Sequence, residues 1–230
     1  MFFDPLWLLF AGPALLLALF AQMRISNTYG KYSKVGNMRG ITGLAVAKTL
    51  LASQGIQDVK IEGTPGRLTD HYDPNTKTLR LSQGVYERTS VAALGIVAHE
   101  VGHAVQDHRG YLPLKLRSGL VPLANLGSSL AIILFMLGFL FRWAGFLWLG
   151  VFLFSAAVLF ALVTLPVELN ASRRARAMLS SAGMVSAQEM DATKAVLSAA
   201  ALTYVAALLQ SVGQLMYFIF SALGMGRNKD

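Results

Sequence analysis

Four stretches of the chain contain no charged residue and consist mainly of apolar side chains. A helix needs about 20 apolar residues to cross the hydrocarbon core of a bilayer, and each stretch reaches or approaches that length. The pattern therefore predicts an α-helical membrane protein with four transmembrane helices, at residues 5–23, 118–141, 143–167 and 195–226.

The first stretch, 5–23, is short and ends near the small residue Ala21, as a secretory signal peptide would. A signal peptide, however, carries its positive charges before the apolar run, and here they come after it. We therefore interpret this stretch as an uncleaved membrane anchor.

The segment 24–117, between the first two apolar stretches, has the mixed pattern of a small α+β domain. A loose apolar face predicts a helix at 39–53, with Gly55 as its C-cap. A second helix is expected to begin near Thr89 or Ser90.

The same segment contains three short runs that are typical of β-strands, bounded by turn-forming residues. They predict strands at 59–62, 67–72 and 78–82. Asp73-Pro74-Asn75 predicts a tight turn between the last two. A helix packed beside a short sheet is the zincin-like arrangement that we expect for this segment.

Lysine and arginine residues gather at the ends of the apolar stretches, and loops rich in them stay on the cytoplasmic side of a membrane. They follow the first stretch, precede the second and follow the third, whereas only Arg142 lies between the second and third. This bias places 24–117 and the segment 168–194, predicted to be a helix, in the cytoplasm and the N-terminus outside. Arg227 and Lys229 argue against this orientation, because it places these two cationic residues outside.

The composition excludes several other classes of protein. Apolar residues make up 54% of the 230 residues and charged residues only 14%, against roughly 25% charged residues in an average protein. The net charge of +8 comes from cations that flank apolar runs and form no single basic face, which indicates a lipid bilayer and no nucleic acid as partner. Because the chain has no cysteine, any metal must be held by histidine and carboxylate groups.

The motif with the most specific chemistry is His99-Glu100-Val101-Gly102-His103. Residues four apart lie on one face of a helix, so the two imidazoles can bind one metal ion. Glu100 directly follows His99, so its side chain points one residue further around the helix axis and can reach a water molecule beside that ion. The alternative is a surface helix with a His/Glu cluster, but apolar neighbours make this a costly place for such groups without a shared task.

A hydrolytic zinc site needs a third protein ligand and an open position. His108 lies about 140° around the helix from His103 and is expected to face elsewhere. Asp107 is expected near the ligands or in solvent. Glu168, at the end of the third apolar stretch and on the same predicted side of the membrane, is the stronger candidate. The alternative is that Glu168 only ends the membrane span.

Five separate motifs follow one another along nearly the whole chain. They are Leu68-Thr69-Asp70-His71-Tyr72-Asp73-Pro74, Leu79-Arg80-Leu81-Ser82, Ala98-His99-Glu100-Val101-Gly102-His103-Ala104, Pro166-Val167-Glu168-Leu169-Asn170-Ala171-Ser172-Arg173-Arg174-Ala175 and Leu202-Thr203-Tyr204-Val205-Ala206-Ala207. In sequence and order these motifs resemble the YugP-type family of bacterial membrane zinc metallopeptidases. More distantly, the arrangement is similar to the HtpX-like and prenyl-protein (CAAX) proteases. In that wider group an aspartate follows the third-ligand glutamate by four residues, where this chain has Ser172.

The resemblance implies a neutral zinc-dependent endopeptidase in the bacterial cytoplasmic (inner) membrane, with one zinc ion per chain and its active site at the cytoplasmic face. Protein or peptide substrates, including membrane proteins, are the expected partners.

Other polar residues are weaker candidates. Arg173 or Arg174 could stabilise negative charge on a substrate carbonyl, although paired arginines after a span more often fix its orientation. Asp70, His71 and Tyr72 could supply an electrophile or orient a histidine ligand, or could only stabilise the adjacent turn.

The strand before the motif helix is a candidate edge to which a peptide substrate adds as an extra strand. Asn170 and Ser172 receive no role. The edge-strand residues are Thr78, Leu79, Arg80, Leu81 and Ser82.

Together these features predict peptide hydrolysis by water activated on a zinc ion that His99, His103 and Glu168 hold, with Glu100 as general base. The alternative is a non-hydrolytic, zinc-stabilised membrane scaffold or adaptor. A metal transporter is disfavoured because no apolar stretch contains an ionisable residue.

Overall fold

The computed structural model describes residues 4–227, which are mostly helical with one small sheet. The chain forms two compact units. Unit 1 contains the chain up to Ala21, Lys115–Pro166 and the chain from Thr203 onward. Unit 2 contains Gln22–Leu114 and Val167–Leu202.

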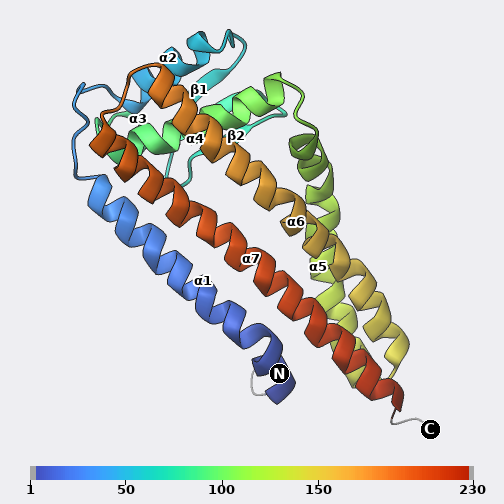
Figure 1. Ribbon diagram of the computed structural model, residues 1–230. Coiled ribbons are helices and arrows are strands. Elements are labelled where there is room, and N and C mark those ends of the chain that lie inside the picture. Colours follow the sequence, from blue (N-terminus) through green and yellow to red (C-terminus); the bar gives the residue numbers. More distant parts are fainter. Residues whose placement is uncertain (1–3, 228–230) are drawn as a thin grey trace. The chain divides into compact units, whose positions relative to one another are not determined.

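Four helices are long and apolar enough to cross a membrane, as the hydropathy pattern predicts (Figure 1). Each of these helices extends beyond its apolar stretch, so that all four contribute residues to both units. They are α1 (Pro5–Tyr32), α5 (Leu112–Leu140), α6 (Ala144–Ser181) and α7 (Ala187–Arg227).

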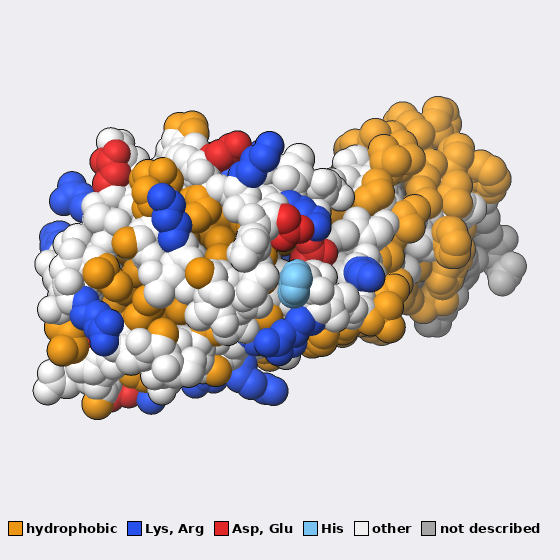
Figure 2. Space-filling model, turned by 90° about the horizontal axis from the view of Figure 1, so that it is seen from above, with side chains coloured by type: hydrophobic (Ala, Val, Ile, Leu, Met, Phe, Trp, Pro, Cys, Tyr) orange, Lys and Arg blue, Asp and Glu red, His pale blue; other side chains and the backbone are white. Residues whose placement is uncertain are grey.

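Unit 1 is held together by apolar and aromatic side chains. The Phe135 and Phe218 rings stack with their centroids 4.0 Å apart, and Leu147 is fully buried beside them. The outward side chains are also apolar: Leu16 is 69% exposed and Phe152 is 74% exposed. In Figure 2, hydrophobic side chains cover one region of the visible surface almost completely. A surface this apolar is consistent with a multi-pass membrane protein.

The helices of unit 2 that lie wholly within it are α2 (Gly43–Ser53), α3 (Gln83–Tyr86) and α4 (Val91–His108). Helix α2 begins at Gly43, four residues after the predicted start at 39, and Thr42 caps it because its hydroxyl accepts from the Ala45 N–H. The C-cap of α2 is Gln54, and Gly55 follows it with a φ of 72°. Gly55 therefore occupies the left-handed position beyond the cap, and the cap itself lies one residue earlier than predicted.

The three-stranded sheet has the order β1-β3-β2, with β1 parallel and β2 antiparallel to β3. The strands are β1 (Lys60–Thr64), β2 (His71–Asp73) and β3 (Thr78–Ser82). The third agrees with its predicted range, and the first is shifted. The predicted strand 67–72 is wrong in extent, because positive φ angles at Gly66 (101°) and Leu68 (59°) keep that part of the chain out of the sheet.

The segment 168–194 is not one helix. Helix α6 continues to Ser181, and α7 begins at Ala187 after a turn in which Gly183 has a φ of 57°. Glu168 therefore lies inside a long helix instead of ending one. Leu179 in the continuation of α6 is fully buried in unit 2, among residues of α2, α4 and the sheet such as Leu50, Leu79 and Val97.

Candidate metal centre

Helix α4 carries the two histidines of the motif, and its start is well defined. Ser90, one of the two residues predicted as its start, is the N-cap, and its hydroxyl accepts from the Ala93 N–H at 3.2 Å. Leu94, Val97 and Val101 are fully buried, each contributing roughly 1.5–3 kcal/mol to folding. This apolar anchoring fixes the rotation of α4, and with it the direction in which its polar side chains point.

The third element of the centre comes from α6, which approaches α4 closely at Gly102. A Cβ atom at this position would lie 2.8 Å from the Ala171 carbonyl oxygen, too close for any side chain. Glycine thus permits the close helix contact at this position. The contact brings Glu168, which is 1% exposed, beside the two imidazoles.

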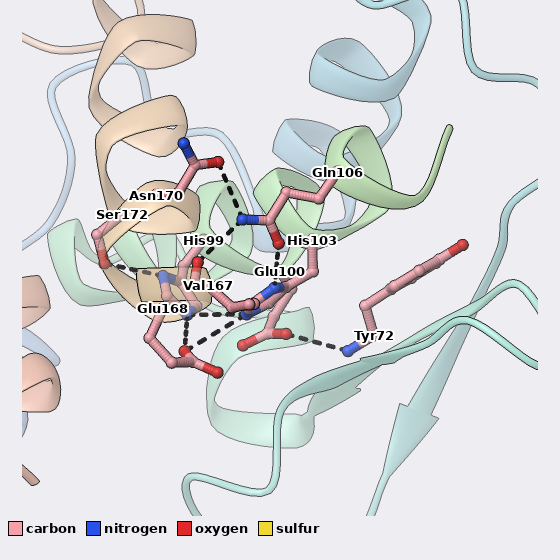
Figure 3. A network of polar contacts seen from close by, with 9 residues as sticks. All are labelled: Tyr72, His99, Glu100, His103, Gln106, Val167, Glu168, Asn170 and Ser172. Atoms are coloured by element: carbon pink, nitrogen blue, oxygen red, sulfur yellow. Dashed lines mark hydrogen bonds and ion pairs between the residues drawn. The ribbon is translucent and has the colours of Figure 1, made fainter. Parts of the chain in front are cut away.

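His99, His103 and Glu168 converge through one ligand atom each (Figure 3). The His99 Nε2 and Glu168 Oε2 atoms are 3.0 Å apart, His103 Nε2 and Glu168 Oε2 3.5 Å, and the two Nε2 atoms 3.2 Å. Ligands about 2.0–2.1 Å from a tetrahedral zinc ion would be separated by about 3.4 Å. The donor types and spacings therefore fit a tetrahedral zinc ion, with a fourth position not filled by these three residues.

The Nδ1 atoms of both histidines contact side chains that the sequence left without a role. His99 Nδ1 lies 3.1 Å from Ser172 Oγ, and His103 Nδ1 lies 2.9 Å from Gln106 Oε1. The Gln106 amide nitrogen donates to Val167 O at 2.9 Å and to Asn170 Oδ1 at 3.0 Å. Metal-binding histidines commonly have such partners, which orient the ring.

Helical spacing offered a partial indication of these residues. Gln106 lies three residues after His103, and Ser172 lies four residues after Glu168, so each shares a helix face with a candidate ligand. Spacing alone does not show that Ser172 contacts His99 on the other helix, 73 positions away.

Glu100 is buried beside the centre and faces strand β2. Its Oε2 atom accepts a hydrogen bond from the Tyr72 N–H at 3.0 Å, which leaves Oε1 outside that contact. Burial raises the pKa of Glu100 to about 8, and the charges of Glu168 and Asp70 add to this increase, while His99 opposes it. A carboxyl group with a pKa near neutrality is well suited to exchanging protons.

The weaker candidates are only partly brought together. The backbone N–H of Tyr72 reaches Glu100, but its hydroxyl donates to Asp107 Oδ2 at 2.9 Å. The His71 side chain is exposed, and its Nδ1–H donates to the Thr69 carbonyl oxygen. Asp70 accepts from the backbone and hydroxyl of Ser82. His71 and the Tyr72 ring therefore have other partners than the centre.

The two arginines also differ. Arg173 is exposed and, within residues 4–227, forms no hydrogen bond or ion pair with the site residues. Arg174 donates from Nε to Asn170 Oδ1 at 2.7 Å and lies over the Tyr111 ring. Arg174 is thus connected to the centre through Asn170.

The prediction that Thr78–Ser82 forms a sheet edge is wrong. This strand, β3, is the middle strand and is paired on both sides, by β1 and by β2. Its backbone groups are used within the sheet, so a peptide cannot add to it. The error arises because strand order depends on tertiary pairing, which the three short apolar runs do not specify.

Comparisons with known proteins agree with this geometry. The family described as "putative neutral zinc metallopeptidase" matches residues 7–223. The chain is also similar to the "putative membrane protease YugP" of Bacillus subtilis (strain 168), with 44% identity over 217 residues that cover 94% of this chain and 96% of the relative. No solved structure matches. The chain belongs to the neutral zinc metallopeptidase family.

Proposed function

We propose that this protein is a zinc-dependent endopeptidase embedded in the bacterial cytoplasmic membrane, with its active site at the cytoplasmic face. The observation that carries the proposal is the convergence of His99, His103 and Glu168, with ligand atoms 3.0–3.5 Å apart, next to the buried Glu100. The small sheet and α4 would form a zincin-like catalytic domain of the type with two histidines and a glutamate.

Each residue has a separate task in this mechanism. His99, His103 and Glu168 would hold one zinc ion per chain. When bound, zinc supplies Lewis acidity, which makes water nucleophilic near neutral pH and polarises a peptide carbonyl group. Glu100 takes the proton of the attacking water on Oε1, while the Tyr72 N–H holds Oε2. Glu100 then delivers this proton to the nitrogen of the leaving amine.

The substrates would be proteins or peptides, including membrane proteins, because the catalytic unit continues into four apolar helices. The family membership and the named membrane protease relative support this class of substrate. A non-hydrolytic zinc-stabilised scaffold would use the same three ligands, but it would have no need for a buried glutamate whose pKa is raised.

The test uses the full-length protein, purified in detergent or in nanodiscs. Zinc content is measured by mass spectrometry and peptidase activity with unfolded casein, with and without a chelator. We expect about one zinc per chain, activity that the chelator abolishes, and an E100Q variant that keeps zinc but does not cleave. An E100Q variant as active as wild type would overturn the mechanism. Bound zinc with no cleavage of casein or of membrane-protein substrates would favour the scaffold.

The proposed orientation can be tested separately, because the chain has no cysteine. Single cysteines would replace Ser53, expected in the cytoplasm, and Arg142, expected outside; both positions are exposed. A membrane-impermeant maleimide should label R142C in intact spheroplasts and S53C only after lysis. The reverse pattern would place the active site outside.

A further inference from the structure

The Gln106 side chain occupies an unusual position beside the candidate metal centre. It is 0% exposed, and its amide has three partners: His103 Nδ1, the Val167 carbonyl oxygen and Asn170 Oδ1. All three are within 3.0 Å, so both N–H groups and the oxygen of this buried amide are satisfied (Figure 3). An amide buried so completely is ordered in one orientation.

The direction of these hydrogen bonds is set by a group that can only accept. The Val167 carbonyl has no proton, so the Gln106 atom facing it must be the NH2 nitrogen. Gln106 Oε1 then faces His103 Nδ1, and an oxygen without a proton can only accept. His103 must therefore carry a proton on Nδ1, which makes Nε2, facing His99 and Glu168, the ring atom available to a metal ion.

Asn170 strengthens this assignment from the other side. Arg174 Nε always carries a proton, and it donates to Asn170 Oδ1 at 2.7 Å. The same Oδ1 atom accepts from the Gln106 amide. The orientation of Asn170 is thus fixed by an obligate donor, just as that of Gln106 is fixed by an obligate acceptor.

We propose that Gln106, held by Val167 and by the Asn170–Arg174 pair, is a positioning residue that keeps the neutral His103 imidazole in the Nδ1–H form with Nε2 ready to bind the metal ion. This proposal rests on the metal site of the proposed function. It also connects the two helices of the centre, because Gln106 on α4 contacts residues on either side of Glu168 on α6.

The contact at Nδ1 of the other histidine does not fix a direction in this way. Ser172 Oγ lies 3.1 Å from His99 Nδ1, but a hydroxyl group can donate or accept. Ser172 therefore tolerates either tautomer of His99, whereas Gln106 permits only one tautomer of His103. The two contacts form an internal control for the proposal, since both touch Nδ1 of a candidate ligand.

The test compares Q106L with S172A in the full-length protein. We expect Q106L to weaken zinc affinity about 10- to 100-fold, the usual cost of losing such a partner, and S172A to weaken it less. The zinc affinity is measured by competition with a chelator of known strength. The role of Asn170 as acceptor for Gln106 and Arg174 is tested with two variants. N170D keeps the accepting oxygen and should bind zinc nearly as tightly as wild type, whereas N170L lacks this oxygen and should bind zinc more weakly.

A second readout needs neither zinc nor peptidase activity. In the zinc-free protein with 15N-labelled histidine, the ring nitrogens of His103, assigned with H103A, should show a fully protonated Nδ1 in wild type, S172A and N170D. Q106L should shift these signals toward a mixture of tautomers. This readout separates failure of the proposal from failure of the proposed enzymatic function.

The proposal is overturned if Q106L leaves the His103 signals unchanged and the zinc affinity within threefold of wild type. It is also overturned if S172A changes both as much as Q106L does. If Q106L does not fold, as judged by circular dichroism, the comparison of N170D with N170L tests the proposal instead. Equal zinc affinities and equal His103 signals in these two variants would contradict the proposed role of Asn170 in holding Gln106.

Discussion

Unit 1 and unit 2 each contain a close contact between two helices at a glycine, but the two contacts bring different groups together. In unit 1, a Cβ atom at Gly127 would lie 2.6 Å from the Leu153 carbonyl oxygen, and in unit 2 a Cβ atom at Gly102 would lie 2.8 Å from the Ala171 carbonyl oxygen. Both glycines permit a close helix contact. In unit 1 the contact joins apolar helices only, whereas in unit 2 it brings a buried carboxylate to two histidines.

The difference in polar content explains this division. The parts of α1, α5, α6 and α7 that lie in the apolar stretches of unit 1 contain no charged residue, whereas all four histidines belong to unit 2. Unit 2 also buries Glu100 and Glu168, which are 8% and 1% exposed. Burying carboxyl groups is costly unless they have partners. Packing in unit 2 therefore positions the polar side chains of the candidate metal centre. Substitutions that disturb this packing should affect metal binding, whereas equal substitutions in unit 1 should not.

The largest expected effect is on catalysis. E100Q should reduce peptidase activity by about 10²–10⁴-fold, the usual contribution of a general acid–base group, while zinc content stays near one per chain. H103A should remove the zinc itself, because it deletes a ligand. Zinc analysis and casein cleavage on the same preparations distinguish these outcomes, and E100Q protein without zinc would contradict the separation of roles.

The buried Glu100 should also make the stability of zinc-free unit 2 depend on pH. Its pKa is raised to about 8 from 4.5, so the folded state keeps a proton that the unfolded state loses as the pH rises above 4.5. Stability should therefore be highest below that pH and fall by up to about 4 kcal/mol as the pH approaches 8. E100Q should lack this contribution.

Thermal unfolding of the zinc-free protein from pH 5 to pH 8 measures the effect. The difference in stability between E100Q and wild type should grow in favour of E100Q as the pH rises. A constant difference over this range would show that Glu100 is not buried as the structure has it.

The matched glycines give the sharpest test of the comparison between the units. G102A should push α6 away from α4 and lower zinc affinity at least tenfold, because Glu168 moves from the histidines. G127A introduces the same methyl group against a carbonyl oxygen in unit 1 and should lower thermal stability without changing zinc affinity. Equal losses of zinc affinity in the two variants would break the comparison.

The smallest expected effect concerns Tyr72, whose backbone and side chain have separate partners. Y72F removes the hydrogen bond to Asp107 and should cost about 1 kcal/mol in stability. The backbone N–H that holds Glu100 remains, so zinc content and most of the activity should persist. A loss of activity as large as that of E100Q would give the Tyr72 hydroxyl a direct role.

Features encoded by neighbouring residues were predictable. Apolar stretches of about 20 residues indicate long helices, and the four-residue spacing of His99 and His103 indicates a shared helix face whatever the rest of the fold does. The cap at Ser90 and the strand at Thr78–Ser82 also follow from local sequence. The strand predicted at 67–72 failed because backbone conformation at Gly66 and Leu68 interrupts it.

By itself, the sequence determined the apolar helices, the motif on α4 and the choice of Glu168 as a candidate third ligand. Only the tertiary structure decided that β3 is a central strand, that the Tyr72 backbone holds Glu100, and that Gln106 and Ser172 contact the histidines, with Asn170 holding Gln106. The contacts of Glu100, Asn170 and Ser172 join residues 28 to 73 positions apart. They depend on how closely and at what rotation α4 meets α6 and β2, and no local pattern along the chain specifies those quantities.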